Sequence, residues 1–274
     1  MTINCKGTLV DLSTPKVMGI LNITPDSFYD GGALKTDKDI LTQAEKMLAE
    51  GAAFLDMGGY SSRPGAADIS IDEEMSRVIP AIKLVLKHFP ETLISIDTFR
   101  SAVAQKAVDT GAAIVNDISA GILDEHMMPT VAQLQVPYIM MHMRGTPQTM
   151  KTLTDYKNVL TEVLSYFSER IATARALGIN DLIADPGFGF AKTIEQNFEL
   201  LRQLELFKNL EIPLLAGLSR KSMIYKTLNT TPQEALNGTT ALNTIALMKG
   251  ANILRVHDVK EAVECVRIYQ AFSS

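Results

Sequence analysis

The chain alternates between short apolar segments and longer segments in which apolar residues recur at helical spacing. Eight apolar segments stand out, and each runs directly into polar residues. In chain order they are VMGIL into Asn22, AFL into Asp56, LISI into Asp97, AIV into Asn116 and Asp117, YIMM into His142, LIA into Asp185, LLAGL into Ser219 and Arg220, and ILRV into His257. This pattern predicts buried strands that are each followed by a polar loop.

Helical patterns lie between most of these strands. Residues 36–52 carry apolar residues at helical spacing and a glycine near their end. Residues 70–89 open with Ser70 and Glu73 at capping-box spacing, and residues 231–251 open with Thr231 and Pro232, which suit a helix start. We therefore expect helices that begin near residues 36, 70 and 231.

Repeated strand-then-helix units predict the fold. Eight such units in about 250 residues are typical of a (β/α)8 TIM barrel, which belongs to the α/β class. Residues 1–14 predict a short N-terminal β-hairpin across the barrel floor, and residues 1–274 are expected to form a single domain. An open, doubly wound parallel sheet is the alternative that the pattern alone leaves available.

The barrel predicts where the site lies, because active sites of this fold form at the carboxyl ends of the strands. A polar residue that merely ends a strand is the simpler explanation for any single position. Asp97 equally suits the N-cap of a helix that begins near Phe99, and a lone histidine such as His257 is more often structural. The residues that would converge on one barrel mouth are nevertheless numerous: Asn22, Asp97, Asn116, Asp185, Arg220, Lys221, Arg255 and His257.

Composition and charge narrow the class of partner. The 274 residues are 46% hydrophobic, which is enough for one substantial core, and carry a net charge of −5. A nucleic-acid partner is not favoured, because the phosphate backbone attracts basic surfaces. No apolar run is long enough to cross a bilayer, and no secretory signal is visible. Cys5 and Cys265 lie outside any CxxC motif, which fits reduced thiols in the cytoplasm.

Acidic and amide residues at the mouth indicate a flat heterocycle with several N–H donors. Two of the three candidates, Asp97 and Asp185, are carboxylates, which accept paired hydrogen bonds from an amidine-like edge. The third, Asn116, has a carboxamide that both donates and accepts.

Basic and hydroxyl residues indicate a phosphate group at the same mouth. Loops after strands seven and eight hold phosphate in many barrels, and the planar arginine fork binds phosphate through two hydrogen bonds. The candidates follow the second, seventh and eighth strands: Ser61, Ser62, Arg63, Arg220, Lys221, Arg255 and His257.

The remaining motifs limit the chemistry. The four histidines show no zinc-ligand spacing, whereas Asn22 offers one oxygen to a Mg²⁺ ion that also binds a substrate phosphate. The chain lacks a GxSxG motif and a Cys–His or Ser–Lys nucleophile pair. These features favour direct displacement of a pyrophosphate group by a second substrate.

Several motifs along nearly the whole chain then resemble one family. In order they are NITPDSFYDGG, SSRPGA, SIDTF, NDI, DPGFGFAKT, GLSRKS and RVHDV, which are similar to the successive signatures of the dihydropteroate synthases. The resemblance implies a transferase of folate biosynthesis that condenses 6-hydroxymethyl-7,8-dihydropterin pyrophosphate with para-aminobenzoate. The products would be 7,8-dihydropteroate and pyrophosphate, and the enzyme would be a sulfonamide target.

The resemblance also implies a role for each candidate residue. Asp97, Lys221 and Asn22 are expected to take part in catalysis, with Asn22 as the Mg²⁺ ligand. Pterin is expected at Asp97, Asn116, Asp185 and Lys221, pyrophosphate at Ser61, Ser62, Arg63, Arg255 and His257, and aminobenzoate beside Phe28, Pro64, Lys221 and Ser222.

A mechanism and an assembly follow from the same resemblance. Pyrophosphate would leave first, with help from Mg²⁺, and the aryl amine would then attack the pterin methylene cation in an SN1-like reaction. Residues 22–36 would form a lid that keeps water from this cation, and residues 60–70 would close from the other side. The C-terminal end of the chain would form a homodimer.

Some positions depart from the family pattern, and other functions remain open. Tyr60 stands where glutamate is frequent, Phe99 and Arg100 replace Ser-Lys or Tyr-Lys, Ala191 replaces a common glycine, and Gln196 replaces a frequent histidine. The alternatives are another pterin-binding barrel such as a methyltetrahydrofolate methyltransferase, a Schiff-base lyase that uses Lys221, and a non-catalytic pterin-binding protein.

Overall fold

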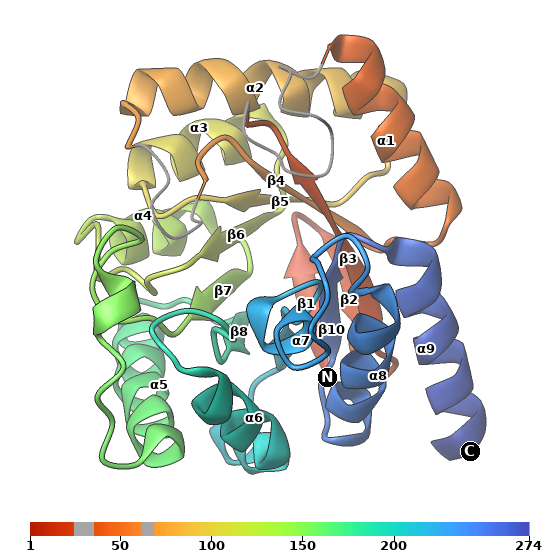
Figure 1. Ribbon diagram of the computed structural model, residues 1–274. Helices are drawn as coiled ribbons and strands as arrows, with labels where there is room; N and C mark the ends of the chain where they lie inside the picture. Colours follow the sequence, from red (N-terminus) through yellow and green to blue (C-terminus); the bar gives the residue numbers. More distant parts are fainter. Residues whose placement is uncertain (25–35, 62–67, 274) are drawn as a thin grey trace.

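The computed structural model describes residues 1–24, 36–61 and 68–273. In this part of the chain, eight parallel strands follow the order β8-β7-β6-β5-β4-β3-β10-β9 (Figure 1). Their bounds are β3 Lys16–Asn22, β4 Phe54–Gly58, β5 Ile94–Asp97, β6 Ile114–Asp117, β7 Tyr138–Met141, β8 Leu182–Asp185, β9 Leu215–Ala216 and β10 Ile253–Val256.

The sheet closes on itself between its first and last strands. Ala184 of β8 pairs in parallel with Leu214, and its N–H donates to the carbonyl of Pro213 at 2.9 Å. The predicted barrel is therefore confirmed, and the open doubly wound sheet is wrong.

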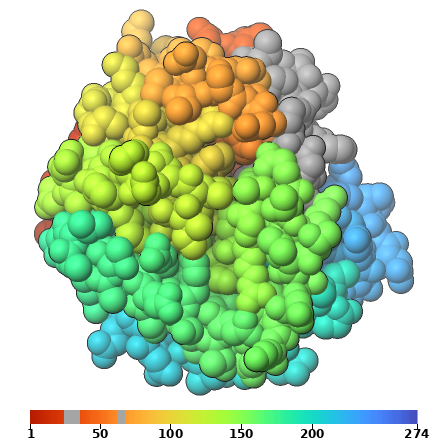
Figure 2. All heavy atoms as spheres, turned by 90° about the vertical axis from the view of Figure 1, so that its left-hand side faces the viewer, coloured from red at the N-terminus to blue at the C-terminus, as the bar shows by residue number. Residues whose placement is uncertain are grey.

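Helices cover the outside of the barrel (Figure 1). They are α1 Asp37–Ala49, α2 Ile71–His88, α3 Ser101–Thr110, α4 Met127–Leu134, α5 Val159–Ala176, α6 Ile194–Arg202, α7 Ser222–Tyr225, α8 Leu236–Met248 and α9 Val259–Ser273, with short 3-10 helices at Met150–Thr152 and Leu204–Leu210. Figure 2 shows the side on which segments coloured orange to green, including α2 to α5, form one continuous surface. Among the helices that the structure describes, none has the length and apolar character needed to span a bilayer.

Helix starts follow local capping chemistry where the sequence carries it. Thr36 caps α1 in a reciprocal box with Asp39, and Ser70 caps α2 by accepting from the Glu73 N–H at 3.1 Å. The predicted start of α8 at Thr231 is wrong, because this helix begins at Leu236. Residues 231–235 instead form turns, in which the Pro232 carbonyl accepts from Arg220 Nη1 at 2.9 Å.

An N-terminal hairpin covers the amino-terminal ends of the strands. Strands β1 (Thr2–Cys5) and β2 (Thr8–Asp11) pair antiparallel. The buried side chains Ile3, Cys5 and Leu12 pack in one cluster with residues of the barrel interior such as Met18. Because the hairpin occupies this end, the opposite, carboxyl end is the one available to a ligand.

Candidate active site

A cavity of about 430 Å³ opens at the carboxyl ends of the strands. The last residue of β5 and the loops after β3, β4, β7, β8, β9 and β10 contribute to its wall. The structure brings eight residues that the sequence singled out to this wall: Asn22, Ser61, Asp97, Arg220, Lys221, Ser222, Arg255 and His257. Four others, Phe28, Ser62, Arg63 and Pro64, lie outside the described residues.

Arg255 bridges two carboxylates at the centre of this mouth. Its Nε donates to Asp56 Oδ2 at 2.6 Å, and its Nη2 donates to Asp97 Oδ2 at 2.7 Å. Burial raises the pKa of Asp97 to about 7, although Arg255 opposes this rise and Asp56 adds to it. Asp97 therefore points toward Arg255 and does not cap α3, whose N-cap residue is Arg100.

Asp56 is a residue to which the sequence analysis gave no role. Its side chain is fully buried, and besides Arg255 it accepts from Asn116 Nδ2 at 3.2 and 3.3 Å. Only the NH2 end of an amide can donate to a carboxylate, so Asp56 fixes the orientation of Asn116. The Asp56 carboxylate thus orients Asn116, a candidate to bind the heterocycle, and Arg255, a candidate to bind the phosphate. The available signal was an acidic residue directly after the apolar run AFL, although Asp56 lies in the middle of β4 and not at its end.

Asp185 and Lys221 lie on the β8 and β9 side of the mouth. Asp185 is buried, its Oδ1 accepts from the Gly187 N–H at 2.8 Å, and burial raises its pKa while Lys221 opposes this rise. Lys221 Nζ donates to the Phe188 carbonyl and lies 4.9 Å from the centroid of the Phe190 ring. Burial lowers the pKa of Lys221 to about 8, against the opposing effect of Asp185.

The histidine at the end of β10 is oriented by a serine. Ser219 Oγ lies 3.0 Å from His257 Nδ1, and it also accepts from the His257 N–H at 3.2 Å. Arg220 borders the cavity, but its Nε and Nη2 donate to the two oxygens of Asp258 at 2.8 Å each. This ion pair fixes the Arg220 guanidinium at the border of the cavity, as Asp56 and Asp97 fix that of Arg255.

Three of the departures from the family pattern pack against one another at the cavity edge. The Tyr60 and Phe99 rings meet edge to face at 5.0 Å, and the Arg100 guanidinium lies 5.2 and 5.3 Å from their centroids. Arg100 also pairs with buried Glu74 at 3.0 Å, while Tyr60 Oη accepts from Gln148 Nε2 at 2.9 Å. These substitutions form one self-consistent cluster and leave the acidic residues of the mouth in place.

The other two departures also have local explanations. Ala191 has a φ of +48°, in the left-handed region that favours glycine, which is consistent with glycine being common there. Gln196 forms the capping box of α6 with Thr193.

The metal ligands of the mouth are few. Among the residues that the structure describes, no three His, Cys, Asp or Glu side chains are grouped to hold a metal ion. Asn22 ends β3 and lines the cavity. A single amide oxygen fits an ion such as Mg²⁺, which keeps several waters and binds mainly through substrate phosphates.

Comparisons with known proteins agree with this geometry. Residues 18–257 match the family model described as "Pterin binding enzyme". Dihydropteroate synthase of Escherichia coli K12 is 45% identical over 273 residues, which cover 99% of this chain and 96% of the relative. The corresponding Synechocystis enzyme is 46% identical over 258 residues, which cover 93% and 89%.

Solved structures give the same result. Yersinia pestis dihydropteroate synthase in a sulfonamide drug complex superposes with a TM-score of 0.95 at 41% identity, covering 100% of this chain and 99% of that one. Xanthomonas albilineans dihydropteroate synthase with 4-aminobenzoic acid superposes with a TM-score of 0.92 at 38% identity, and the match covers 100% of this chain and 98% of that one.

Proposed function

The chain belongs to the dihydropteroate synthase family of pterin-binding transferases, and from this premise we propose its reaction and the role of each residue. The enzyme condenses 6-hydroxymethyl-7,8-dihydropterin pyrophosphate with para-aminobenzoate, and the products are 7,8-dihydropteroate and pyrophosphate. One observation carries the proposal beyond family membership. Arg255 donates to the carboxylates of Asp56 and Asp97. A residue proposed to bind the pyrophosphate, Arg255, thus contacts a residue proposed to bind the pterin, Asp97, in one cavity.

The pterin occupies the acidic half of the mouth. Asp97, Asn116 and Asp185 offer acceptors to its N–H groups, and Lys221 donates to a ring acceptor. Asp56 supports this arrangement, because its bond to the Asn116 NH2 group directs the amide oxygen to a different partner. Burial of these groups favours charge-assisted hydrogen bonds, which are about twice as strong as neutral ones.

The pyrophosphate occupies the basic half. Arg255 and His257 line the cavity there together with Ser61, and Ser62 and Arg63 are proposed to complete the set. Asn22 would hold Mg²⁺ together with the pyrophosphate oxygens. Bound there, the ion would neutralise negative charge on the leaving group.

The reaction proceeds by displacement at the pterin methylene carbon. The bond between this carbon and the pyrophosphate oxygen breaks, and its electron pair leaves with the pyrophosphate. The lone pair of the aryl amine then forms the new C–N bond, and the positively charged nitrogen that results releases a proton to water. The carboxylate of Asp97 stabilises the intervening cation electrostatically, since it is fixed by Arg255 and need not reorganise.

The aminobenzoate enters beside Lys221 and Ser222, and Phe28 and Pro64 are proposed to take part in binding it. The described wall on this side also includes Phe188, Gly189 and Phe190. An aromatic ring fits between apolar side chains, and the Lys221 ammonium attracts its carboxylate.

A Schiff-base reaction at Lys221 is the second candidate, since its lowered pKa of about 8 leaves part of the amine neutral near physiological pH. Borohydride with substrate would trap a covalent adduct on Lys221 if this chemistry occurred.

We further propose a homodimer formed through the C-terminal helices. Helices α8 and α9 lie side by side at one edge of the barrel (Figure 1) and expose large apolar side chains, among them Met248 at 59%, Ile268 at 68% and Phe272 at 75%. The free, buried thiols of Cys5 and Cys265 suit a reducing compartment, so we place the enzyme in the cytoplasm.

Pyrophosphate release tests the function directly. Purified protein is mixed with dihydropterin pyrophosphate and Mg²⁺, with and without para-aminobenzoate, beside the variants Lys221→Ala and Asn22→Ala. We expect release coupled to dihydropteroate formation, and a fall in both variants. Tight pterin binding without release would contradict the synthase assignment and favour a different pterin enzyme or a binding protein.

A further inference from the structure

The loop between β8 and α6 forms one wall of the cavity in an irregular conformation. Residues 186–191 (PGFGFA) make up this wall loop, and Phe188, Gly189 and Phe190 line the cavity. Its backbone enters the left-handed region at Gly187, Gly189 and Ala191, with φ of +68°, +81° and +48°. Because residues with positive φ interrupt the loop, successive carbonyl groups point in different directions and cannot form a regular ladder of hydrogen bonds.

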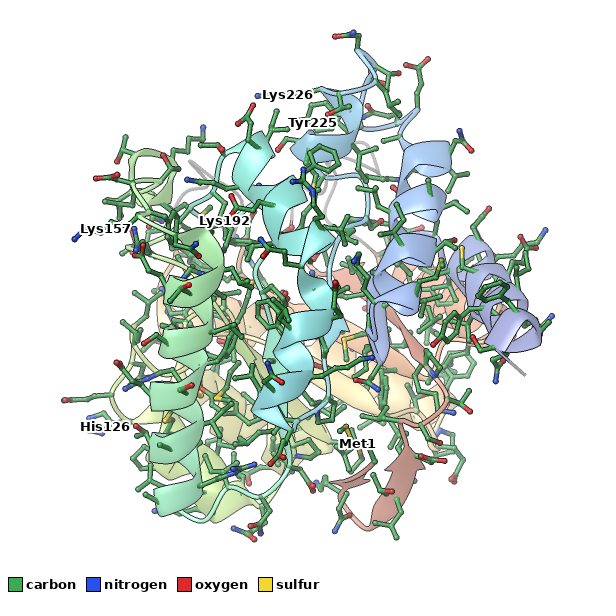
Figure 3. All side chains as sticks on the ribbon, turned by 90° about the horizontal axis from the view of Figure 1, so that it is seen from below. Met1, His126, Lys157, Lys192, Tyr225 and Lys226 are labelled. Carbon is green, nitrogen blue, oxygen red and sulfur yellow. The ribbon has the colours of Figure 1, made fainter. Side chains whose placement is uncertain are left out.

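A buried lysine supplies the hydrogen bonds that this loop needs. Lys192 Nζ donates to the carbonyls of Gly187 and Phe190 at 3.0 Å each and lies 2.9 Å from His142 Nδ1. Nζ also lies 3.4 Å from the His142 carbonyl oxygen, so each of its N–H donors has an acceptor within reach. His142 ends the neighbouring strand β7, so Lys192 also ties the wall loop to that strand. Figure 3 marks Lys192 between α5 and α6.

The surroundings are consistent with this donor arrangement. Burial lowers the pKa of His142 to about 2, so its imidazole is neutral and Nδ1 can accept a hydrogen bond. Burial also lowers the pKa of Lys192 well below its usual value, while Asp185 opposes this. An ammonium group costs several kcal/mol to bury, and this cost is offset only when its donors find acceptors.

The wall loop reaches the reacting residues through a second lysine. Lys221 Nζ donates to the carbonyl of Phe188, which lies between the two carbonyls that Lys192 holds. A Cβ on Gly189 would come within 3.2 Å of Lys221 Cδ, so loop and side chain are in close contact. A shift of the wall loop would therefore move the Lys221 ammonium and the apolar wall together. Lys192 itself does not line the cavity.

We propose that Lys192 is a positioning residue of the synthase reaction: the hydrogen bonds of its Nζ set the conformation of the wall loop on the aminobenzoate side of the cavity. This inference rests on the proposed function. It assigns to Lys192 an effect on the second substrate that differs from its contribution to folding, and the two effects are separable by experiment.

Two substitutions remove the hydrogen-bond donors of Lys192 in part or completely. Lys192→Gln keeps two N–H donors, and Lys192→Met keeps the apolar stem and none. Steady-state KM for para-aminobenzoate, kcat, the Kd of dihydropterin pyrophosphate by calorimetry and the Tm are measured for each. We expect the aminobenzoate KM to rise about threefold in Lys192→Gln and at least tenfold in Lys192→Met. The pterin Kd is expected to change much less than the aminobenzoate KM, because Asp97 and Asn116 keep their partners Arg255 and Asp56 and only Asp185 and Lys221 contact the wall loop.

Control variants separate positioning from loss of stability. Lys249→Met makes the same substitution at a lysine that pairs with Glu205 at 2.7 Å, and it should leave both constants unchanged. Val85→Ala removes buried volume from α2 and should lower the Tm without raising the aminobenzoate KM. If Lys192→Met does not fold, His142→Leu, which removes one acceptor, is expected to raise this KM about threefold.

Two results would overturn the inference. One is an unchanged aminobenzoate KM in folded Lys192→Met. The other is a parallel rise of the aminobenzoate KM and the pterin Kd that Val85→Ala reproduces at an equal Tm. Wild-type protein without synthase activity would instead refute the proposed function itself, so the two failures are distinguishable.

Discussion

Replacing Asp56 by asparagine tests how the mouth is held together. The change keeps the shape of the side chain but removes its charge, so Arg255 loses one of its two carboxylate partners. A hydrogen bond to a charged group contributes about 1.5–3 kcal/mol to stability. We therefore expect the free energy of unfolding to fall by about 2 kcal/mol, since Asp97 still neutralises the guanidinium.

The same substitution changes the pKa of Asp97 in a predictable direction. Asp56 raises the pKa of Asp97 and Arg255 lowers it, and the pKa lies at about 7 in the native protein. Carboxylates that share one guanidinium lie a few Å apart, and at an effective dielectric constant of about 20 their charges interact by a few kcal/mol, or roughly 2 pKa units. Without the charge of Asp56 and with Arg255 paired to Asp97 alone, we expect this pKa to fall by one to two units.

The pH dependence of kcat/KM for dihydropterin pyrophosphate measures this shift. If ionised Asp97 is required, activity in the wild type declines as the pH falls through about 7, and in Asp56→Asn the decline begins one to two units lower. Asp258→Asn is the matched control, because it removes a carboxylate from Arg220 at the border of the cavity. A folded Asp56→Asn protein whose acid limb coincides with that of the wild type would refute the reasoning.

Three further predictions concern burial and backbone. Burial lowers the pKa of His142 to about 2, so the native state holds this imidazole neutral while the unfolded chain protonates it below a pKa of about 6.5. The free energy of unfolding therefore falls as the pH falls below about 6.5. Between pH 7.5 and 5, denaturant unfolding should show that the wild type loses about 2 kcal/mol more of this free energy than His142→Asn. Gly187→Ala would place a Cβ 2.1 Å from the His142 carbonyl oxygen and should lower the free energy of unfolding by about 3 kcal/mol or more. The control Gly178→Ala has a similar positive φ and nothing within 4 Å of its Cβ, so it should lower this free energy by only about 1 kcal/mol. Equal Tm shifts in the two variants would contradict this reasoning. Burial raises the pKa of the Cys5 thiol to about 12, so a thiol reagent should modify Cys5 only in denaturant, and modification at the same rate in native protein would refute this.

Local sequence chemistry accounted for most of the barrel. Short apolar runs became strands because a parallel strand with helices outside it is buried on both faces. Ser70 capped α2 as its spacing indicated, yet α8 did not begin at Thr231. There the guanidinium of Arg220 bonds the Pro232 carbonyl, and a contact with a residue twelve positions earlier cannot be read from local spacing.

The candidate site, like the fold, could be predicted from the sequence only in part. Eight of the candidate residues reach one cavity, since strand ends converge wherever parallel strands close into a barrel. Asp56 and Lys192 received no role from the sequence, because neither lines the cavity and each acts through another residue. The departures Tyr60, Phe99 and Arg100 looked unrelated along the chain, but they form one packed cluster.

The sequence by itself determined the order of strands and helices, most of the polar residues near the strand ends and the family to which the chain belongs. These properties depend on residue type and on neighbours a few positions away. Only the tertiary structure decided which polar ends touch. Arg255 meets Asp56 and Asp97 across separations of 199 and 158 residues, because β10 pairs with β3 when the barrel closes. Strand register sets that contact, and register is a property of the closed sheet rather than of any one segment.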